Sequence, residues 1–318
     1  MRRHGYILSH IAPMTLALIA TTACEHKPLW MPETPIEPTV VEYDWSECRD
    51  AVTPGMTLYL YPPENDESPW LFNLKSTGGT ITVPEGYYRA ISYNNNTDGV
   101  LFRNTGNYCL IEAYTREGNL LDGFETPYIG SLPARTADEP VVIMPDMMWT
   151  AAETVEVNGE KLTLTPHRIT PLYRFTASDV RNISGVADVC ASLSGLIGGI
   201  YLNDYNGASY PVTMPSKAKK ATDNSITGSM VTFGIPPEPS ARNILTLYFR
   251  LKDGSKHSFN FDVTTQIRNA PDPFDVKINV AGVNLPELPE PPVNPDEGGI
   301  GVDVDTWHTV DIELKPFI

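Results

Sequence analysis

The feature that most constrains the fold is a series of short apolar and aromatic runs, separated by turn residues at intervals of roughly ten positions. Several runs alternate apolar and polar residues, which is typical of strands with one buried face. The 29 prolines and 23 glycines supply turns, and no long segment keeps a helical period. The runs of the first half are Met56–Tyr61, Trp70–Leu74, Gly79–Val83, Tyr87–Tyr93, Val100–Phe102, Tyr108–Tyr114 and Val141–Met144. This spacing predicts an all-β sandwich or barrel.

Two hairpins are predicted in the second half. Asn158-Gly159 lies between Val155–Val157 and Leu162–Leu164, and both turn positions tolerate positive φ. Asp253-Gly254 joins Ile244–Leu251 to Lys256–Thr264, whose alternation indicates one buried face and one solvent face. Further strands are predicted at Leu172–Phe175, Val186–Leu193, Gly199–Leu202 and Val276–Val280, with one helical turn at Ser178–Ile183.

Chain length and proline-rich segments predict the domain organisation. A chain of 318 residues has room for about two domains. A boundary between two strand series is predicted between Trp149 and Leu172, a stretch that contains Pro166 and Pro171. We therefore expect β-domains over 46–160 and 161–284, followed by a Pro/Gly linker and a terminal strand over 285–318.

The C-terminal tail is predicted to be one amphipathic strand, or two. Val302 and Val304 alternate with acidic residues, and so do Val310, Ile312 and Leu314. Trp307 lies between the two runs and belongs to the same candidate segment. A single strand is not stable alone, so the tail must pair with a sheet. Our first expectation is that it closes a sheet edge of its own molecule. The alternative is that it is a strand-exchange segment, which adds to the sheet of another subunit.

The N-terminus has the features of an export signal. Arg2 and Arg3 precede the apolar stretch Ile7–Ala23, which is too short and interrupted to span a bilayer. Cys24 follows small residues, an arrangement that resembles the lipobox of bacterial lipoproteins, although Thr21 stands where that motif usually has leucine. The resemblance implies a signal peptide over 1–23 and acyl chains such as palmitate on Cys24. Prolines at 28, 32, 35 and 38 favour extended backbone and predict a Pro-rich tether over 24–45. The alternative is an unmodified cysteine behind a plain secretory cleavage site.

The net charge indicates which partners the protein does not bind, and the cysteines indicate burial and possible disulfide pairing. The formal net charge is -16, so the surface repels phosphate backbones and anionic headgroups, and we expect no nucleic-acid partner. Cys190 lies in an apolar run and is predicted to be buried. Cys48 with Cys109 is the one pair that we consider for a disulfide in an oxidising compartment.

No catalytic motif is present. The chain lacks H-E-x-x-H, G-x-S-x-G, a P-loop and G-x-G-x-x-G. The histidines that follow Cys24 are far apart in sequence and are expected to be surface or hydrogen-bonded residues: His26, His167, His257 and His308. We therefore expect a protein that is not an enzyme and that needs no cofactor.

One segment partly matches a calcium-binding loop. Asn94, Asn96, Asp98 and Gly99 fit the first half of an EF-hand loop, but Thr105 stands at the position of the final glutamate. The segment also follows a predicted strand and not a helix. We expect an ordinary asparagine-rich turn and no metal.

Three short motifs resemble a known family. They are Val83–Asn94 (VPEGYYRAISYN), Arg168–Phe175 (RITPLYRF) and Val302–Trp307 (VDVDTW). Together with the cysteine after the signal, they resemble the fimbrillin-type lipoproteins of Bacteroides-like bacteria, particularly the fimbrial anchor subunit branch. The resemblance implies two tandem transthyretin-like β-sandwiches, and a lipid anchor at Cys24 that holds a surface-exposed protein in the outer membrane. It also implies other fimbrial (pilus) subunits as partners in cell adhesion.

Two other function classes remain open. A glycan-binding surface lipoprotein of a nutrient-uptake system would use tryptophans as stacking platforms, and the chain has Trp30, Trp45, Trp70, Trp149 and Trp307. A surface hydrolase would need two close carboxylates in a concave site. Our first expectation is a fimbrial anchor or assembly subunit that acts through β-strand complementation.

Overall fold

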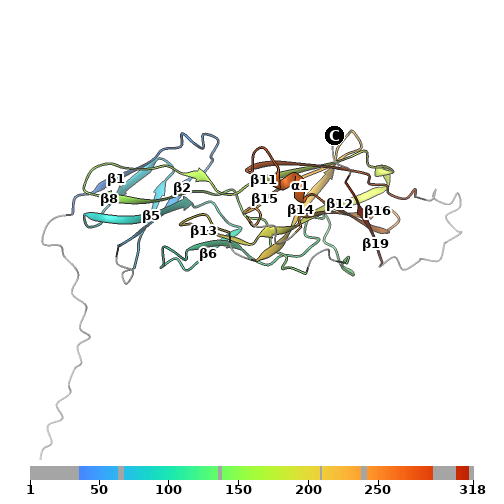
Figure 1. The fold of residues 1–318 in the computed structure, drawn as a ribbon, viewed down its shortest axis with the longest axis horizontal. Helices are drawn as coiled ribbons and strands as arrows, with labels where there is room; N and C mark the ends of the chain where they lie inside the picture. The colour runs from blue at the N-terminus through green and yellow to red at the C-terminus, as the bar shows by residue number, and fades with distance from the viewer. Residues whose placement is uncertain are drawn as a thin grey trace, which may run out of the picture. The chain divides into compact units, whose positions relative to one another are not determined.

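The computed structural model describes residues 36–63, 68–134, 138–207, 210–237, 242–288 and 306–314. The expected signal, Cys24, most of the expected tether, Val302 and Val304 lie outside these residues. Within the described residues the protein is all-β, with two eight-stranded sheets, a three-stranded sheet, one α-helix and one 3-10 turn (Figure 1). The predicted all-β class with tandem β-sandwiches is confirmed.

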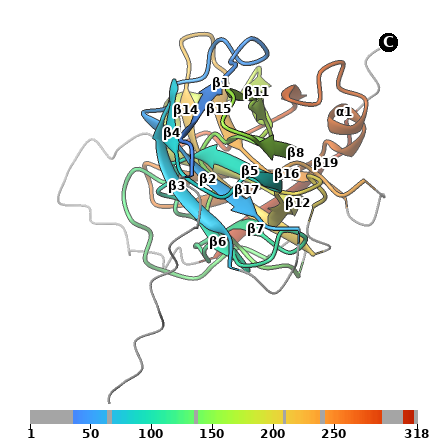
Figure 2. The same cartoon turned by 90° about the vertical axis from the view of Figure 1, so that its left-hand side faces the viewer.

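The first sheet is built from the first half of the chain and has the strand order β10-β8-β5-β2-β3-β4-β1-β9. Its strands are β1 (Thr39–Tyr43), β2 (Gly55–Tyr61), β3 (Trp70–Lys75), β4 (Gly78–Ile81), β5 (Gly86–Asn94), β8 (Trp149–Val157), β9 (Leu162–Leu164) and β10 (His167–Arg168). Alternate side chains of these strands enclose a core that includes Val41, Met56, Leu58, Leu60 and Val155. Figure 2 views the protein from the side of this sheet.

The second sheet has the strand order β18-β11-β15-β14-β12-β16-β17-β19. Its elements are β11 (Leu172–Ser178), η1 (Ile183–Gly185), β12 (Val186–Ile197), β14 (Pro211–Lys220), β15 (Ile226–Val231), β16 (Ile244–Leu251), β17 (Lys256–Asp262), α1 (Thr264–Arg268), β18 (Asp275–Ala281) and β19 (Trp307–Ile312). Phe175, Leu193, Phe249 and Phe261 are fully buried in its core. The predicted hairpin at Asp253-Gly254 is confirmed, because β16 and β17 pair in antiparallel register.

A three-stranded sheet joins the two halves of the chain. Its strands are β6 (Val100–Arg103), β7 (Glu112–Thr115) and β13 (Gly199–Tyr201), in the order β13-β7-β6. Arg103 donates two hydrogen bonds of 2.7 Å to the buried Glu112 carboxylate. Main-chain pairing between β7 and β13 therefore links residues that the sequence assigns to different domains.

The observed boundaries differ from the expected ones at both ends of the first sheet. Thr39–Tyr43 is a strand although it lies inside the expected tether, because its inward side chains enter the core. Asn158-Gly159 forms a turn, with Gly159 at φ 81°, but β9 then pairs in parallel with β1 and not with β8. This pairing buries Leu164 in the first core, so the first sheet extends to Arg168, beyond the expected domain end at 160.

A segment of the first half packs against the second sheet: residues 120–124 cover its outer face, and Val142 lies in its core. We call this segment the belt and define it as residues 117–134 and 138–146. Leu120, Leu121 and Phe124 of the belt pack against Cys190 and Tyr248. The predicted solvent face of β16 is thus wrong, because Tyr248 is 3% exposed beneath the belt. The approach is close: a Cβ on Gly123 would lie 2.2 Å from the Ser216 carbonyl oxygen.

Polar contacts fix the belt to the sheet at two places. The Asp188 carboxylate accepts hydrogen bonds from the Glu125 and Thr126 amides at 3.3 Å and from Arg250 at 3.0 Å. The Glu139 carboxylate accepts from the Gly195 amide at 2.9 Å and from the Thr213 hydroxyl at 2.8 Å. Both carboxylates are buried, so each contact replaces water that the group has lost.

Candidate functional site

The tail forms β19, which is the last strand of the second sheet. It pairs in parallel with β17, from Lys256 opposite Trp307 to Phe261 opposite Ile312. No described strand pairs with the other side of β19. The first of the two expectations for the tail, that it closes an edge of its own molecule, describes this arrangement.

Trp307 is the aromatic anchor at the start of β19. Its ring lies 5.9 Å from Tyr128 of the belt and 5.8 Å from Tyr248 of β16, edge-on to both. Its indole nitrogen donates a 2.7 Å hydrogen bond to the Ser131 carbonyl oxygen. The belt therefore contributes directly to the docking of the tail.

Polar pairs on the same face extend this contact along the strand. The hydroxyls of Ser258 and Thr309 are 2.9 Å apart. The Asn260 side-chain amide donates to the Asp311 carboxylate at 2.8 Å. These pairs match the main-chain register, so they favour one alignment of β19 over a shifted one.

The opposite face of β19 adds little apolar burial. Ile312 and the following Leu314 are partly buried against the core of the second sheet. On this face Val310 is 43% exposed and His308 is also exposed, and on the Trp307 face Thr309 and Asp311 are exposed as well. The strand is therefore held by main-chain pairing and a few anchors and not by a deep apolar slot.

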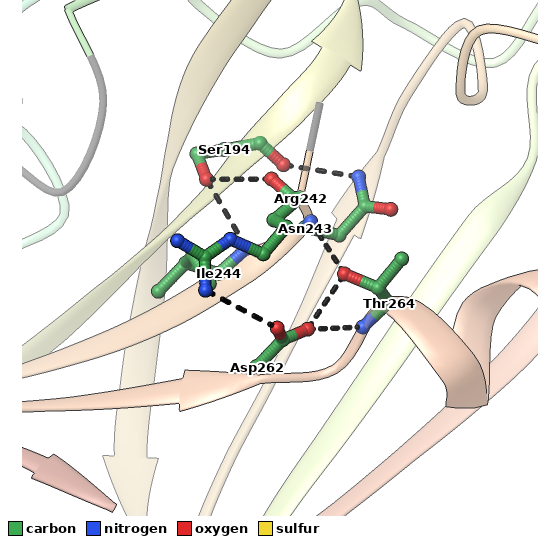
Figure 3. A network of polar contacts seen from close by, with 6 residues as sticks. All are labelled: Ser194, Arg242, Asn243, Ile244, Asp262 and Thr264. Carbon is green, nitrogen blue, oxygen red and sulfur yellow. Dashed lines mark hydrogen bonds and ion pairs between the residues drawn. The ribbon is translucent and has the colours of Figure 1, made fainter. Parts of the chain in front are cut away.

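The edge that receives β19 is fixed more firmly than β19 itself. Figure 3 shows Asp262, the last residue of β17, accepting hydrogen bonds from the amide and hydroxyl of Thr264 at 3.1 and 2.6 Å. The Thr264 hydroxyl accepts from the Asn243 amide at 2.9 Å, and the Asn243 side chain donates to the Ser194 carbonyl oxygen at 3.1 Å. This network ties the end of β17 to β12 and β16 through contacts that do not involve β19.

Two surface hollows border the end of β19. One, of about 1070 Å³, is lined by polar residues that include Asn260, Thr309 and Asp311. The other, of about 810 Å³, lies beside α1 and β18 and reaches Leu314. Both hollows show that the end of the strand is bordered by open surface.

Two histidines that are distant in sequence meet across the β17–β19 pair. The rings of His257 and His308 lie 5.1 Å apart and are nearly parallel, with 24° between their planes. Burial and the neighbouring His308 lower the pKa of His257 below its ordinary value. The sequence contains no signal for this pairing, because only the register of β17 and β19 creates it.

Asn94 and His167, which the sequence analysis considered as candidate site residues, make contacts within the fold. Asn94 of the calcium-like segment donates from its side-chain amide to Asn96 and to the Met147 carbonyl oxygen and accepts from the Trp149 amide. His167 contacts Tyr205 edge-on at 4.8 Å. The side chain of Asn94 is thus used to join β5 to the start of β8.

The tryptophans do not gather into a binding platform within the described residues. Trp149 is buried, Trp45 donates to the Ser76 carbonyl oxygen, and Trp70 is 38% exposed on β3. Trp307 is part of the belt contact, and Trp30 lies outside the described residues. No two of the four tryptophans that the structure describes are in ring contact.

The three cysteines of the described residues are free thiols. Cys48 and Cys190 are buried and Cys109 is exposed, so the disulfide considered between Cys48 and Cys109 is not formed. The predicted burial of Cys190 is confirmed, and burial raises the pKa of its thiol well above the ordinary value. Among the helices described, none has the length and apolarity to cross a membrane.

Three known proteins resemble this chain in sequence or in fold. A Bacteroides ovatus protein provisionally named fimbrium anchoring subunit Fim4B is 26% identical, over 98% of each chain. The crystal structure of a provisionally named adhesin from Bacteroides ovatus aligns with a TM-score of 0.61 and 23% identity, over 81% of this chain and 95% of that one. The fimbrial anchor protein Mfa2 from Porphyromonas gingivalis aligns with a TM-score of 0.50 and 13% identity, over 78% and 91% of the two chains.

The structural matches are too distant in sequence to establish more than a common fold. The match along nearly the whole length of Fim4B confirms the resemblance to fimbrial anchor proteins that the three motifs indicated. The family model described as a domain of unknown function, DUF5119, matches residues 23–217, which is more than half of the sequence. The chain therefore belongs to the DUF5119 family.

Proposed function

We propose that this protein is a lipid-anchored outer-membrane subunit that anchors or assembles a fimbrium through β-strand complementation. The observation that carries the proposal is β19, an edge strand with mostly exposed side chains on a firmly held partner strand. Residues 289–305 connect Leu288 to the tail, and about 17 residues can span roughly 55 Å when extended. This connecting segment is long enough for the tail to reach the sheet of a neighbouring subunit.

The mechanism is mechanical and involves no catalysis. Acyl chains on Cys24 hold the N-terminus in the membrane, where two lipid chains give stable anchoring. If β19 leaves β17, the edge exposes a row of main-chain donors and acceptors that an incoming strand satisfies. Pairing along a whole strand gives a joint that tolerates variation in the partner sequence. The names of the relatives support a role in fimbriae and adhesion.

Lipid anchoring is tested by Cys24→Ala. We expect the variant to leave the membrane fraction and any filaments to appear in the medium, because the thiol that carries the acyl chains is absent. The measurement is immunoblotting of membranes and medium from cells that make either form, with Cys109→Ala as the matched control that keeps the anchor. Retention of Cys24→Ala in the membrane would exclude a lipid anchor at this residue. Release without filaments in either strain would exclude the fimbrial role.

Strand pairing is tested by removing residues 302–318. We expect loss of filaments from cells and a lower unfolding temperature of the purified protein, because the β17 edge is left unpaired and the Trp307 contact is removed. Filament yield and thermal unfolding measure the two effects. A truncated protein with unchanged filaments and unchanged unfolding temperature would rule out a role for the tail.

A further inference from the structure

The stacked histidines lie at the contact on which the proposed function depends. His257 and His308 are opposite each other in the β17–β19 register, at the same end of the strand pair as Trp307. Side chains alternate along a strand, so both rings lie on the face that also carries Phe259 and Ile312. His257 is half-buried and His308 is exposed, so protons reach the pair without unfolding of the core.

Few acidic side chains near His257 and His308 could neutralise two positive charges on the pair. On β16 the residue opposite His257 is the uncharged Phe249. From the turn before β17, Asp253 is the one carboxylate that acts on His257, and it already accepts hydrogen bonds from the amide and hydroxyl of Ser255. From β19 the titratable neighbour is His308 itself. Lys256 and Asp311 lie on the opposite face of the strand pair.

We propose that His257 and His308 form an acid-sensitive latch, which holds β19 on its own sheet at neutral pH and releases it in mild acid. Like charges about 5 Å apart repel across a partly buried gap, whereas neutral rings stack. The latch rests on the proposed function, since a released tail becomes available to a neighbouring subunit. The latch extends that function, because it makes the exchange of the tail between subunits depend on pH.

The direction of the pH effect follows from the pKa of His257. Burial and the neighbouring His308 lower this pKa in the docked strand below its ordinary value of 6.5. Departure of β19 removes the contribution of His308, so the released form binds the proton more tightly. Docking is therefore at full strength above pH 6.5 and weakens as the pH falls below that value. Neutral conditions keep the tail docked, and mildly acidic conditions favour its release.

The test is hydrogen exchange of purified protein at pH 7.5 and 5.5, followed by mass spectrometry of peptides that contain β19. Protection of β19 is compared at each pH with that of β2 in the first sheet, which removes the intrinsic pH dependence of exchange. We expect the relative protection of β19 to fall by about tenfold at pH 5.5. In His308→Gln and in His257→Gln the fall should be less than about twofold, because only one ring remains to be charged.

His167→Gln, which changes a histidine in the first sheet, is the matched control and should retain the fall. An equal fall in wild type and both latch variants would overturn the proposal, as would constant protection in the wild type. His308 is exposed, so its replacement should leave the fold intact. This readout uses a single subunit; a working latch without fimbrial assembly would refute the proposed function and not the latch.

Discussion

Replacement of Trp307 by alanine is expected to free the terminal strand while the two sheets stay folded. The substitution removes the ring contacts with Tyr128 and Tyr248 and the hydrogen bond to the Ser131 carbonyl oxygen. Truncation of a fully buried tryptophan costs about 3–5 kcal/mol. Trp307 is half-buried, so the docking of β19 should weaken by about 2–3 kcal/mol. Hydrogen exchange of the β19 amides measures this change.

Val310→Ala is the matched control for Trp307→Ala. Val310 lies three residues away on the same strand and is 43% exposed, so its truncation should change docking by less than about 0.5 kcal/mol. Thermal unfolding of the first sheet should be the same in both variants. Equal exchange of β19 in the two variants would show that Trp307 is not the anchor.

A second large effect is expected from Asp188→Ala, which cuts the attachment of the belt. The substitution leaves the Glu125 and Thr126 amides without their acceptor and removes the partner of Arg250. Loss of one partner of a buried ion pair costs about 3–5 kcal/mol. Denaturant unfolding should show a decrease of this size in the free energy of unfolding.

Cys190 provides a local readout of the same change. Its thiol is buried beneath Leu120, Leu121 and Phe124, so opening of the belt should speed its alkylation in folded protein. Glu42→Ala is the matched control: it breaks an exposed ion pair with Lys161 and should cost less than about 0.5 kcal/mol. Unchanged stability and unchanged alkylation in Asp188→Ala would show that Asp188 does not hold the belt.

The elements that the sequence predicted well are those defined by local patterns. The β16–β17 hairpin follows from Asp253-Gly254 between alternating runs, and the tail strand follows from alternation alone. Burial of Cys190 follows from its apolar neighbours. Each of these properties depends on residues within a few positions of one another.

The sequence-based predictions are wrong where the structure depends on contacts between segments that are distant in the chain. Asn158-Gly159 turns the chain as expected, but β9 pairs with β1, where Leu164 enters the first core, and no local pattern encodes that partner. The solvent face assigned to β16 is covered by Leu120 and Phe124, which lie more than a hundred residues earlier. Alternation marks the inward face of a strand, but it does not reveal what covers the outward face.

The candidate site was predictable to the same extent. Alternation identifies Val310 and Ile312 as parts of one strand, and the sequence leaves two acceptors open, a sheet of the same molecule or a sheet of another subunit. The choice of β17, the parallel direction and the meeting of His257 with His308 depend on a register set by Trp307, Ser258 and Asn260 together. A register of this kind is a property of the assembled sheet and cannot be read from either strand.

The belt also determines how such a protein can change over evolutionary time. Leu121 and Phe124 belong to the first half of the chain but complete the packing of the second, and β7 depends on β13 for its partner. A second half recombined with a foreign first half would present Tyr248 and Cys190 to water and would lack the surface on which Trp307 rests. The two sheets are consequently inherited together, and new partner specificity is more easily acquired by substitutions in the tail than by exchange of whole domains.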